Sequence, residues 1–88
     1  MKTYRKNDDA IGASLGASVV ILNTESLKYF ELTEVAARIW ELLDFGPVSF
    51  QKICALLLAE FEVSETTCQT SVNAFLKDAV SRGLVYEE

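Results

Sequence analysis

The chain has 88 residues, 50% of them hydrophobic, which is enough for one domain with its own core and too few for two. Its 8 Lys and Arg against 13 Asp and Glu give a formal net charge of -5, the wrong sign for binding nucleic-acid phosphates. It contains no histidine, the commonest general base and metal ligand. The composition favours a binding module over an enzyme, without metal or cofactor.

Signals for export or membrane insertion are not evident. Residues 1–9 are polar and charged, unlike a signal peptide, and no apolar run approaches the ~20 residues that cross a bilayer. We therefore expect a cytoplasmic protein without membrane contact. Cys54 and Cys68 each fall in an apolar helical stripe, which predicts two buried thiols rather than a metal site or a disulfide.

The first third of the chain has the composition of strands. Residues 3–6 predict a weak first strand and residues 12–16 a flexible stretch, whereas the β-branched run 18–22 predicts a buried strand. Turn-forming residues 23–26 separate this strand from a third extended segment, 27–32. Together these segments predict a three-stranded antiparallel sheet.

Three helices follow, each predicted by a capping residue and an apolar stripe. Thr33, Ser49 and Ser64 are placed to cap them, and apolar residues then recur at intervals of three and four. Residues 84–86 predict a short extended tail. The expected fold class is α+β, a single domain over residues 1–88 in which a three-stranded antiparallel sheet precedes three helices in a winged helix-turn-helix-like arrangement.

Such an arrangement also occurs in DNA-binding regulators. The exposed side of the third predicted helix is mostly neutral or acidic, with only Lys77 and Arg82 as nearby cations. A recognition helix without a basic surround holds phosphate poorly, so the sequence disfavours nucleic acid as a partner. A winged-helix DNA-binding regulator remains an alternative, and a structural dimerisation module is a third.

Several motifs follow one another along the chain. Residues 29–43 carry an aromatic pair, a Leu, a polar cap and then a helix with the pattern small-x-Ile-Trp-x-Leu-Leu. Residues 46–49 read Gly-Pro-Val-Ser and are followed by Ile53, Leu57 and Phe61, residues 72–76 carry Val-x-x-Phe-Leu, and residues 82–85 read Arg-Gly-Leu-Val. In this order the motifs resemble the three helices and the closing tail of the PqqD family. The resemblance extends from about residue 19 to residue 85.

The resemblance implies a non-catalytic recognition element for a ribosomally synthesised, modified peptide. The leader segment of the precursor would add as an antiparallel strand to the third strand and fill a groove against the third helix. A separate leader peptidase or other modifying enzyme would receive it, and the B1-type leader-binding protein of lasso peptide pathways is the favoured parallel. The alternative is a PqqD-type chaperone that presents a precursor to a radical S-adenosylmethionine enzyme. We expect a monomer or weak dimer.

The candidate peptide-binding residues follow from this placement. On the strand, Phe30 and Leu32 share one face, which is typical of packing, while Tyr29 and Glu31 point the other way. The net negative charge predicts a leader or partner with some basic character. The full predicted set is Leu27, Lys28, Tyr29, Phe30, Glu31 and Leu32 on the strand, and Val72, Asn73, Leu76, Lys77 and Val80 on the helix.

Overall fold

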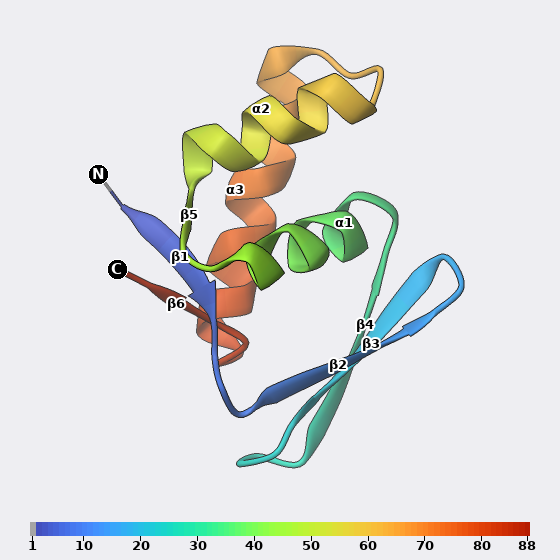
Figure 1. The fold of residues 1–88 in the computed structure, drawn as a ribbon, viewed down its shortest axis with the longest axis vertical. Coiled ribbons are helices and arrows are strands. Elements are labelled where there is room, and N and C mark those ends of the chain that lie inside the picture. The colour runs from blue at the N-terminus through green and yellow to red at the C-terminus, as the bar shows by residue number, and fades with distance from the viewer. Residues whose placement is uncertain (1) are drawn as a thin grey trace.

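The computed structural model describes residues 2–88 as two small sheets with helices packed between and above them (Figure 1). In chain order the elements are β1 (Thr3–Lys6), β2 (Ala10–Leu15), β3 (Ser18–Asn23), β4 (Lys28–Thr33), α1 (Glu34–Leu42), the 3-10 turn η1 (Leu43–Phe45), β5 (Val48–Ser49), α2 (Phe50–Glu60), α3 (Glu65–Ser81) and β6 (Val85–Glu87). The α+β class and the three α-helices are therefore confirmed.

The strands form two antiparallel sheets, ordered β5-β1-β6 and β2-β3-β4. The prediction of one sheet built from residues 3–6, 18–22 and 27–32 is wrong, because β1 pairs with β5 and β6 instead of with the hairpin. The predicted C-terminal extension is β6, one edge of this second sheet. The third strand beside the β3–β4 hairpin is β2, which pairs with β3 along its whole length.

The segment predicted to be flexible, residues 12–16, thus lies largely within β2. The glycine at position 12 allows close packing, because a Cβ atom on Gly12 would lie 2.6 Å from Nε1 of Trp40. The indole of Trp40, on α1, is 3% exposed and covers the sheet at this point. The absence of a side chain at Gly12 is what lets α1 approach the sheet.

Two of the three predicted helix caps form hydrogen bonds. The hydroxyls of Ser49 and Ser64 accept from the backbone N–H groups of Lys52 and Thr67, each at 3.1 Å. Thr33 occupies the cap position of α1 but makes no side-chain capping bond. The next residue, Glu34, has a φ of +52°, so the chain turns sharply from β4 into α1 without the usual cap geometry.

The core lies between the sheets and the helices. Helix α3 contributes a buried stripe of Cys68, Val72, Leu76 and Ala79. Cys54 and Cys68 are buried free thiols, as predicted. Burial, with a smaller contribution from Cys68, raises the pKa of Cys54 to about 11, so its thiol stays protonated at neutral pH. Within residues 2–88, no helix has both the length and the apolar character needed to cross a bilayer.

Both sheets are tied to the C-terminal end of α3 through one carbonyl group. The side-chain amide of Asn7, which follows β1, donates to the backbone oxygen of Gly83 at 2.7 Å. The amide of Asn23, at the end of β3, donates to the same oxygen at 3.3 Å. Both asparagines are buried, and a buried amide without a partner costs free energy. These bonds fix the end of α3 against the β2-β3-β4 sheet.

Candidate functional site

Strand β4 is an edge strand. In the sheet order β2-β3-β4 it pairs with β3 on one side and with no other strand of the described chain on the other. Its register with β3 places Phe30 opposite Ile21 and Leu32 opposite Val19, so these side chains face the core and are half-buried. Tyr29, on the other face, is 72% exposed. The predicted alternation is confirmed, and the edge has one apolar and one exposed face.

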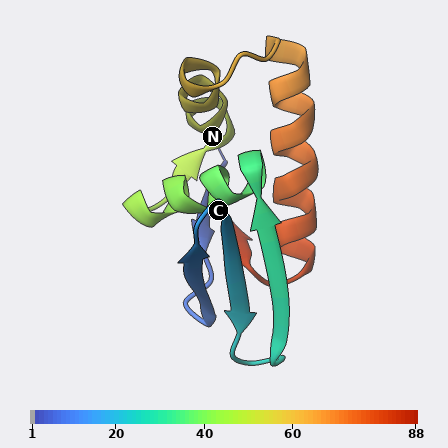
Figure 2. The ribbon, with the colours of Figure 1, turned by 90° about the vertical axis from the view of Figure 1, so that its right-hand side faces the viewer.

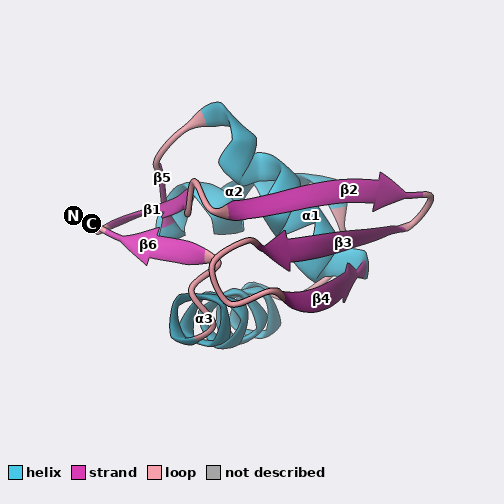
Figure 3. Ribbon diagram, turned by 90° about the horizontal axis from the view of Figure 1, so that it is seen from below, coloured by secondary structure: helices cyan, strands magenta, loops and turns pink. Residues whose placement is uncertain are grey.

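Helix α3 runs alongside β4, as two perpendicular views show (Figures 2 and 3). The guanidinium carbon of Arg82 lies 4.9 Å from the centre of the Phe30 ring. Arg82 also pairs through Nε with Asp78 at 2.9 Å. Because residues three and four apart share a helix face, Phe75 lies on the same stripe as Asp78 and Arg82. This stripe, which we call the β4 flank of α3, borders one side of the surface between the helix and the sheet edge, and β4 borders the other; we refer to this surface as the groove beside β4.

The groove is apolar at the end where β4 joins α1. Val35, in the first turn of α1, lines a small cavity of about 30 Å³ together with Phe61, Val63 and Ser71. Leu32 and Phe75 are half-buried and pack against the core, and Val63 is 41% exposed. An extended segment lying against β4 would therefore meet apolar side chains at this end.

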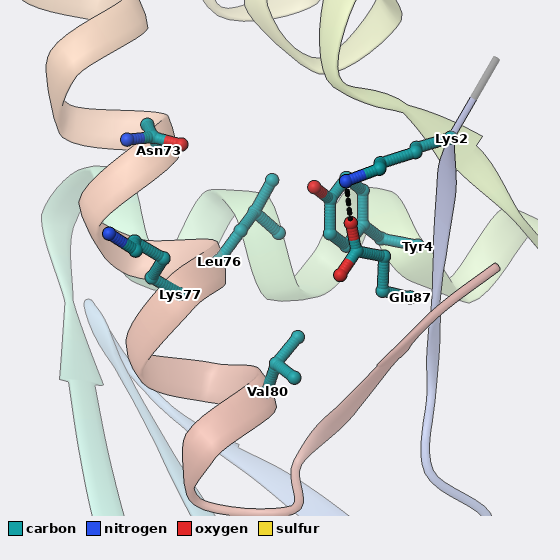
Figure 4. Close-up of a pocket in the computed structure, with 7 residues that line it drawn as sticks. All are labelled: Lys2, Tyr4, Asn73, Leu76, Lys77, Val80 and Glu87. Carbon is teal, nitrogen blue, oxygen red and sulfur yellow. Dashed lines mark ion pairs between the residues drawn. The ribbon is translucent and has the colours of Figure 1, made fainter.

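The predicted helix residues lie elsewhere. Val72 and Leu76 belong to the core, at 0% and 2% exposure. Asn73, Lys77 and Val80 lie on the opposite flank of α3 from Arg82. There they line a larger cavity of about 320 Å³, whose other wall comes from β1 and β6 (Figure 4). Val72 and Leu76 therefore share the core with Phe30 and Leu32, whereas Asn73, Lys77 and Val80 lie away from β4.

The larger cavity has a charged rim. Nζ of Lys2 pairs with Oε1 of Glu87 at 2.8 Å. The hydrogen bond and charge of Glu87 raise the pKa of Lys2 above its usual value of 10.5. Tyr4, Leu76 and Val80 supply the apolar part of the wall, as Figure 4 shows. This second surface, which we call the β6 flank of α3, differs in chemistry from the groove beside β4.

The predicted set does not include Val35, Asp78 and Arg82, and the assignment of Phe75 to packing agrees with its half-buried position against the core. The periodicity of α3 identifies its buried stripe, but it does not say which flank of that stripe faces β4. That choice depends on where the two sheets lie, which the sequence pattern did not predict. The spacing of Phe75, Asp78 and Arg82 along one stripe was the available signal.

The exposed face of the β2-β3-β4 sheet is also apolar. Ile11, Leu22 and Tyr29 form one cross-strand row, because Leu22 pairs with both of the others. Ile11 is 60% exposed and Leu15, two rows along the same face, is 62% exposed. Exposed apolar side chains gathered on one sheet face are typical of a protein-binding surface. We call this surface the outer sheet face.

The comparisons with known proteins point in one direction. Among curated proteins, no relative is found. Among solved structures, TbiB1 in complex with the TbiA(beta) leader peptide matches with a TM-score of 0.86 and 28% identity, over 92% of this chain and 93% of that one. A lasso peptide synthetase B1 complexed with the leader peptide matches with a TM-score of 0.81 and 24% identity, over 94% and 96% of the two chains, and shows the same fold. The family model described as coenzyme PQQ synthesis protein D (PqqD) matches residues 18–85, more than half of the sequence, and the chain therefore belongs to the PqqD family.

Proposed function

We propose that this protein binds the leader segment of a ribosomally synthesised precursor peptide and delivers it to a separate enzyme, without catalysing a reaction itself. The observation that carries the proposal is the similarity over 92% of the chain to TbiB1, a protein seen with a leader peptide. The free edge of β4 beside α3 supplies the physical means. We favour a lasso peptide pathway, with a cytoplasmic leader peptidase as the receiving enzyme.

The leader adds to β4 as an antiparallel strand. Backbone groups along β4, Lys28–Thr33, provide the main-chain hydrogen bonds, and the side chains on the inner face provide selectivity. Leu27, predicted as part of this edge, lies in the turn before β4, and its N–H donates to the backbone oxygen of Asn23. Since β4 runs toward α1, the N-terminal end of the leader strand lies beside Val35 and its C-terminal end beside Lys28. On α3 we assign the wall to Phe75, Asp78 and Arg82. In this assignment Val72 and Leu76 support the wall from the core.

The arrangement is winged helix-turn-helix-like, with the β3–β4 hairpin as the wing, but it is used for peptide and not for DNA. Lys77 is the only cation within α3 and Arg82 is its C-terminal cap, and the two lie on opposite flanks of the helix. Arg82 is already paired with Asp78. A phosphate backbone needs a continuous basic surface, which this helix does not offer.

Titration of the protein with two labelled ligands tests this assignment. Fluorescence anisotropy with the leader peptide of the precursor encoded beside it should show saturable, micromolar or tighter binding, and duplex DNA should show none. Leader variants with single N-methylated amides should lose affinity at alternate positions, because only every second amide of an added strand faces β4. DNA binding that depends steeply on salt, without leader binding, would refute the proposal and favour the alternative of a winged-helix DNA-binding regulator.

Delivery to the enzyme uses the outer sheet face. The leader, once added to β4, becomes a fourth strand of the same sheet, so an enzyme that covers Ile11, Leu15 and Tyr29 also comes close to the bound peptide. The apolar character of this face supports a protein partner, and each of these side chains is more than half exposed.

Substitution of Ile11 and Leu15 by Asp separates delivery from binding. Both side chains are on β2, two strands away from the β4 edge, so leader affinity should stay within about twofold of the wild type. Leader removal by the peptidase of the same pathway should fall about tenfold or more, because charged groups replace apolar contacts at the centre of an interface. Unchanged processing with the folded double variant would show that the enzyme docks elsewhere.

A further inference from the structure

The groove beside β4 changes chemistry along its length. Beside α1 it is bounded by Leu32, Val35 and Phe75, all half-buried apolar side chains. At the other end lie the cations Lys28 and Arg82. An extended peptide in this groove would therefore meet apolar surface first and positive charge later.

The two cations belong to the same end of the groove. Lys28 is the cross-strand partner of Asn23 in the β3–β4 pair. The side chain of Asn23 donates to the carbonyl of Gly83, the residue after Arg82. Lys28 faces the same side of the sheet as Phe30, because alternate residues of a strand share a face. The guanidinium carbon of Arg82 lies 4.9 Å from the centre of the Phe30 ring. Register and contacts thus place both cations around Phe30.

Hydrogen-bonding capacity is left over at this end. Within residues 2–88, Arg82 uses only Nε, which pairs with Asp78 at 2.9 Å, and no bond from its two Nη groups is recorded. Lys28 is exposed and forms no ion pair with any residue of 2–88. Guanidinium groups bind carboxylates well because two parallel N–H groups match the two oxygens. The neighbouring Glu31 points to the other face of β4, and Asp78 is the acid paired with Arg82.

We propose that the groove selects a leader with an apolar residue opposite Leu32 and, four residues later, a carboxylate side chain that binds between Lys28 and Arg82. The proposal rests on the proposed function, since it assumes a leader strand antiparallel to β4. The spacing follows from the strand period of two, which places inward-facing leader residues opposite Leu32, Phe30 and Lys28 in turn.

This local chemistry differs from the prediction drawn from net charge. The whole chain carries a formal charge of -5, which predicted a partner with basic character. At short range, however, the nearest groups dominate, because exposed charges beyond about 8 Å are screened at physiological ionic strength. Lys28, Arg82 and Asp78 together leave one positive charge at this end of the groove. An acidic leader residue is therefore favoured there even on an acidic protein.

An mRNA-display selection of random peptides on the immobilised full chain tests this inference without a known leader sequence. Peptides enriched on the wild type should carry an apolar residue and an Asp or Glu four positions later. Peptides selected on the Arg82→Glu variant should carry Lys or Arg at this position instead of Asp or Glu. Peptides selected on the Arg82→Ala variant should show no charge preference there. Individual acidic peptides should bind Arg82→Glu about tenfold more weakly than the wild type, as expected for loss of a charge-assisted pair. Circular dichroism would verify that each variant is folded.

Lys52→Glu is the matched control, because Lys52 is an exposed cation on α2 and its replacement changes the net charge equally. The control should keep the acidic preference. An absence of acidic preference on the wild type, or the same preference on wild type and folded Arg82→Glu, would overturn the inference and leave leader binding intact. Failure to enrich any peptide would instead overturn the proposed function together with the inference.

Discussion

Helix α3 has an edge strand beside each of its flanks, and the two edges differ. On the β4 flank, a six-residue strand lies beside Phe75 and Arg82. On the β6 flank, the strand has only three residues. The Lys2–Glu87 ion pair lies on the strand wall of the cavity, and Lys77 lies on its helix wall. The cavity on the β6 flank has a volume of about 320 Å³, whereas the small cavity of about 30 Å³ that Val35 lines lies between α1, α2 and α3 and includes no residue of β4.

For an extended peptide, we expect the length of a free strand edge to matter more than cavity volume. About half of the backbone groups of an edge strand point away from its sheet, so six residues of β4 offer about twice as many partners as three residues of β6. Apolar side chains beside β4 then add selectivity, whereas a charged, solvated rim adds little affinity. The two flanks can be separated experimentally by substitutions on each side.

The largest effect is expected from Phe30→Ala. This substitution removes the ring that lies between the core and Arg82, and leader affinity should fall about tenfold or more, as for truncation of an aromatic anchor at an interface. The free energy of unfolding should also fall, by about 2 kcal/mol, because the ring is half-buried. Anisotropy titrations with the leader peptide and urea denaturation would measure the two effects separately.

Tyr29→Ala provides the comparison on the same strand. Tyr29 is 72% exposed on the outer sheet face, so its truncation should change stability by less than about 0.5 kcal/mol. Leader affinity should change much less than in Phe30→Ala, since the side chain does not face the groove. Equal losses of leader affinity in both folded variants would contradict the placement of the leader against the inner face of β4.

The sequence predicts the local elements of this fold better than their pairing. The stripe of α3 and the caps at Ser49 and Ser64 depend on residues close in sequence, and the structure confirms them. The partner of β1 depends on residues more than forty positions away, for which no periodicity gives a signal. Gly12 shows the same limit: its role depends on Trp40, which reaches it only in the folded protein.

For the candidate site as well, local features follow from the sequence and long-range placement does not. The edge character of β4 and the opposite orientations of Tyr29 and Phe30 follow from strand alternation, so sequence reasoning could reach them. Which flank of α3 faces that edge depends on how both sheets attach to the end of the helix, through Asn7 and Asn23. Two long-range hydrogen bonds therefore contribute to a feature that helical periodicity alone leaves open.

The smallest effect is expected from Lys77→Glu, on the β6 flank. It reverses the same charge as Arg82→Glu and lies on the same helix, but its side chain lines the cavity with Lys2 and Glu87 instead of the groove beside β4. Leader affinity in anisotropy titrations should therefore stay within about twofold of the wild type, because an exposed charge on the far side of the helix is screened. A loss of leader affinity of about tenfold in Lys77→Glu would indicate that the leader binds at the β6 flank and not beside β4.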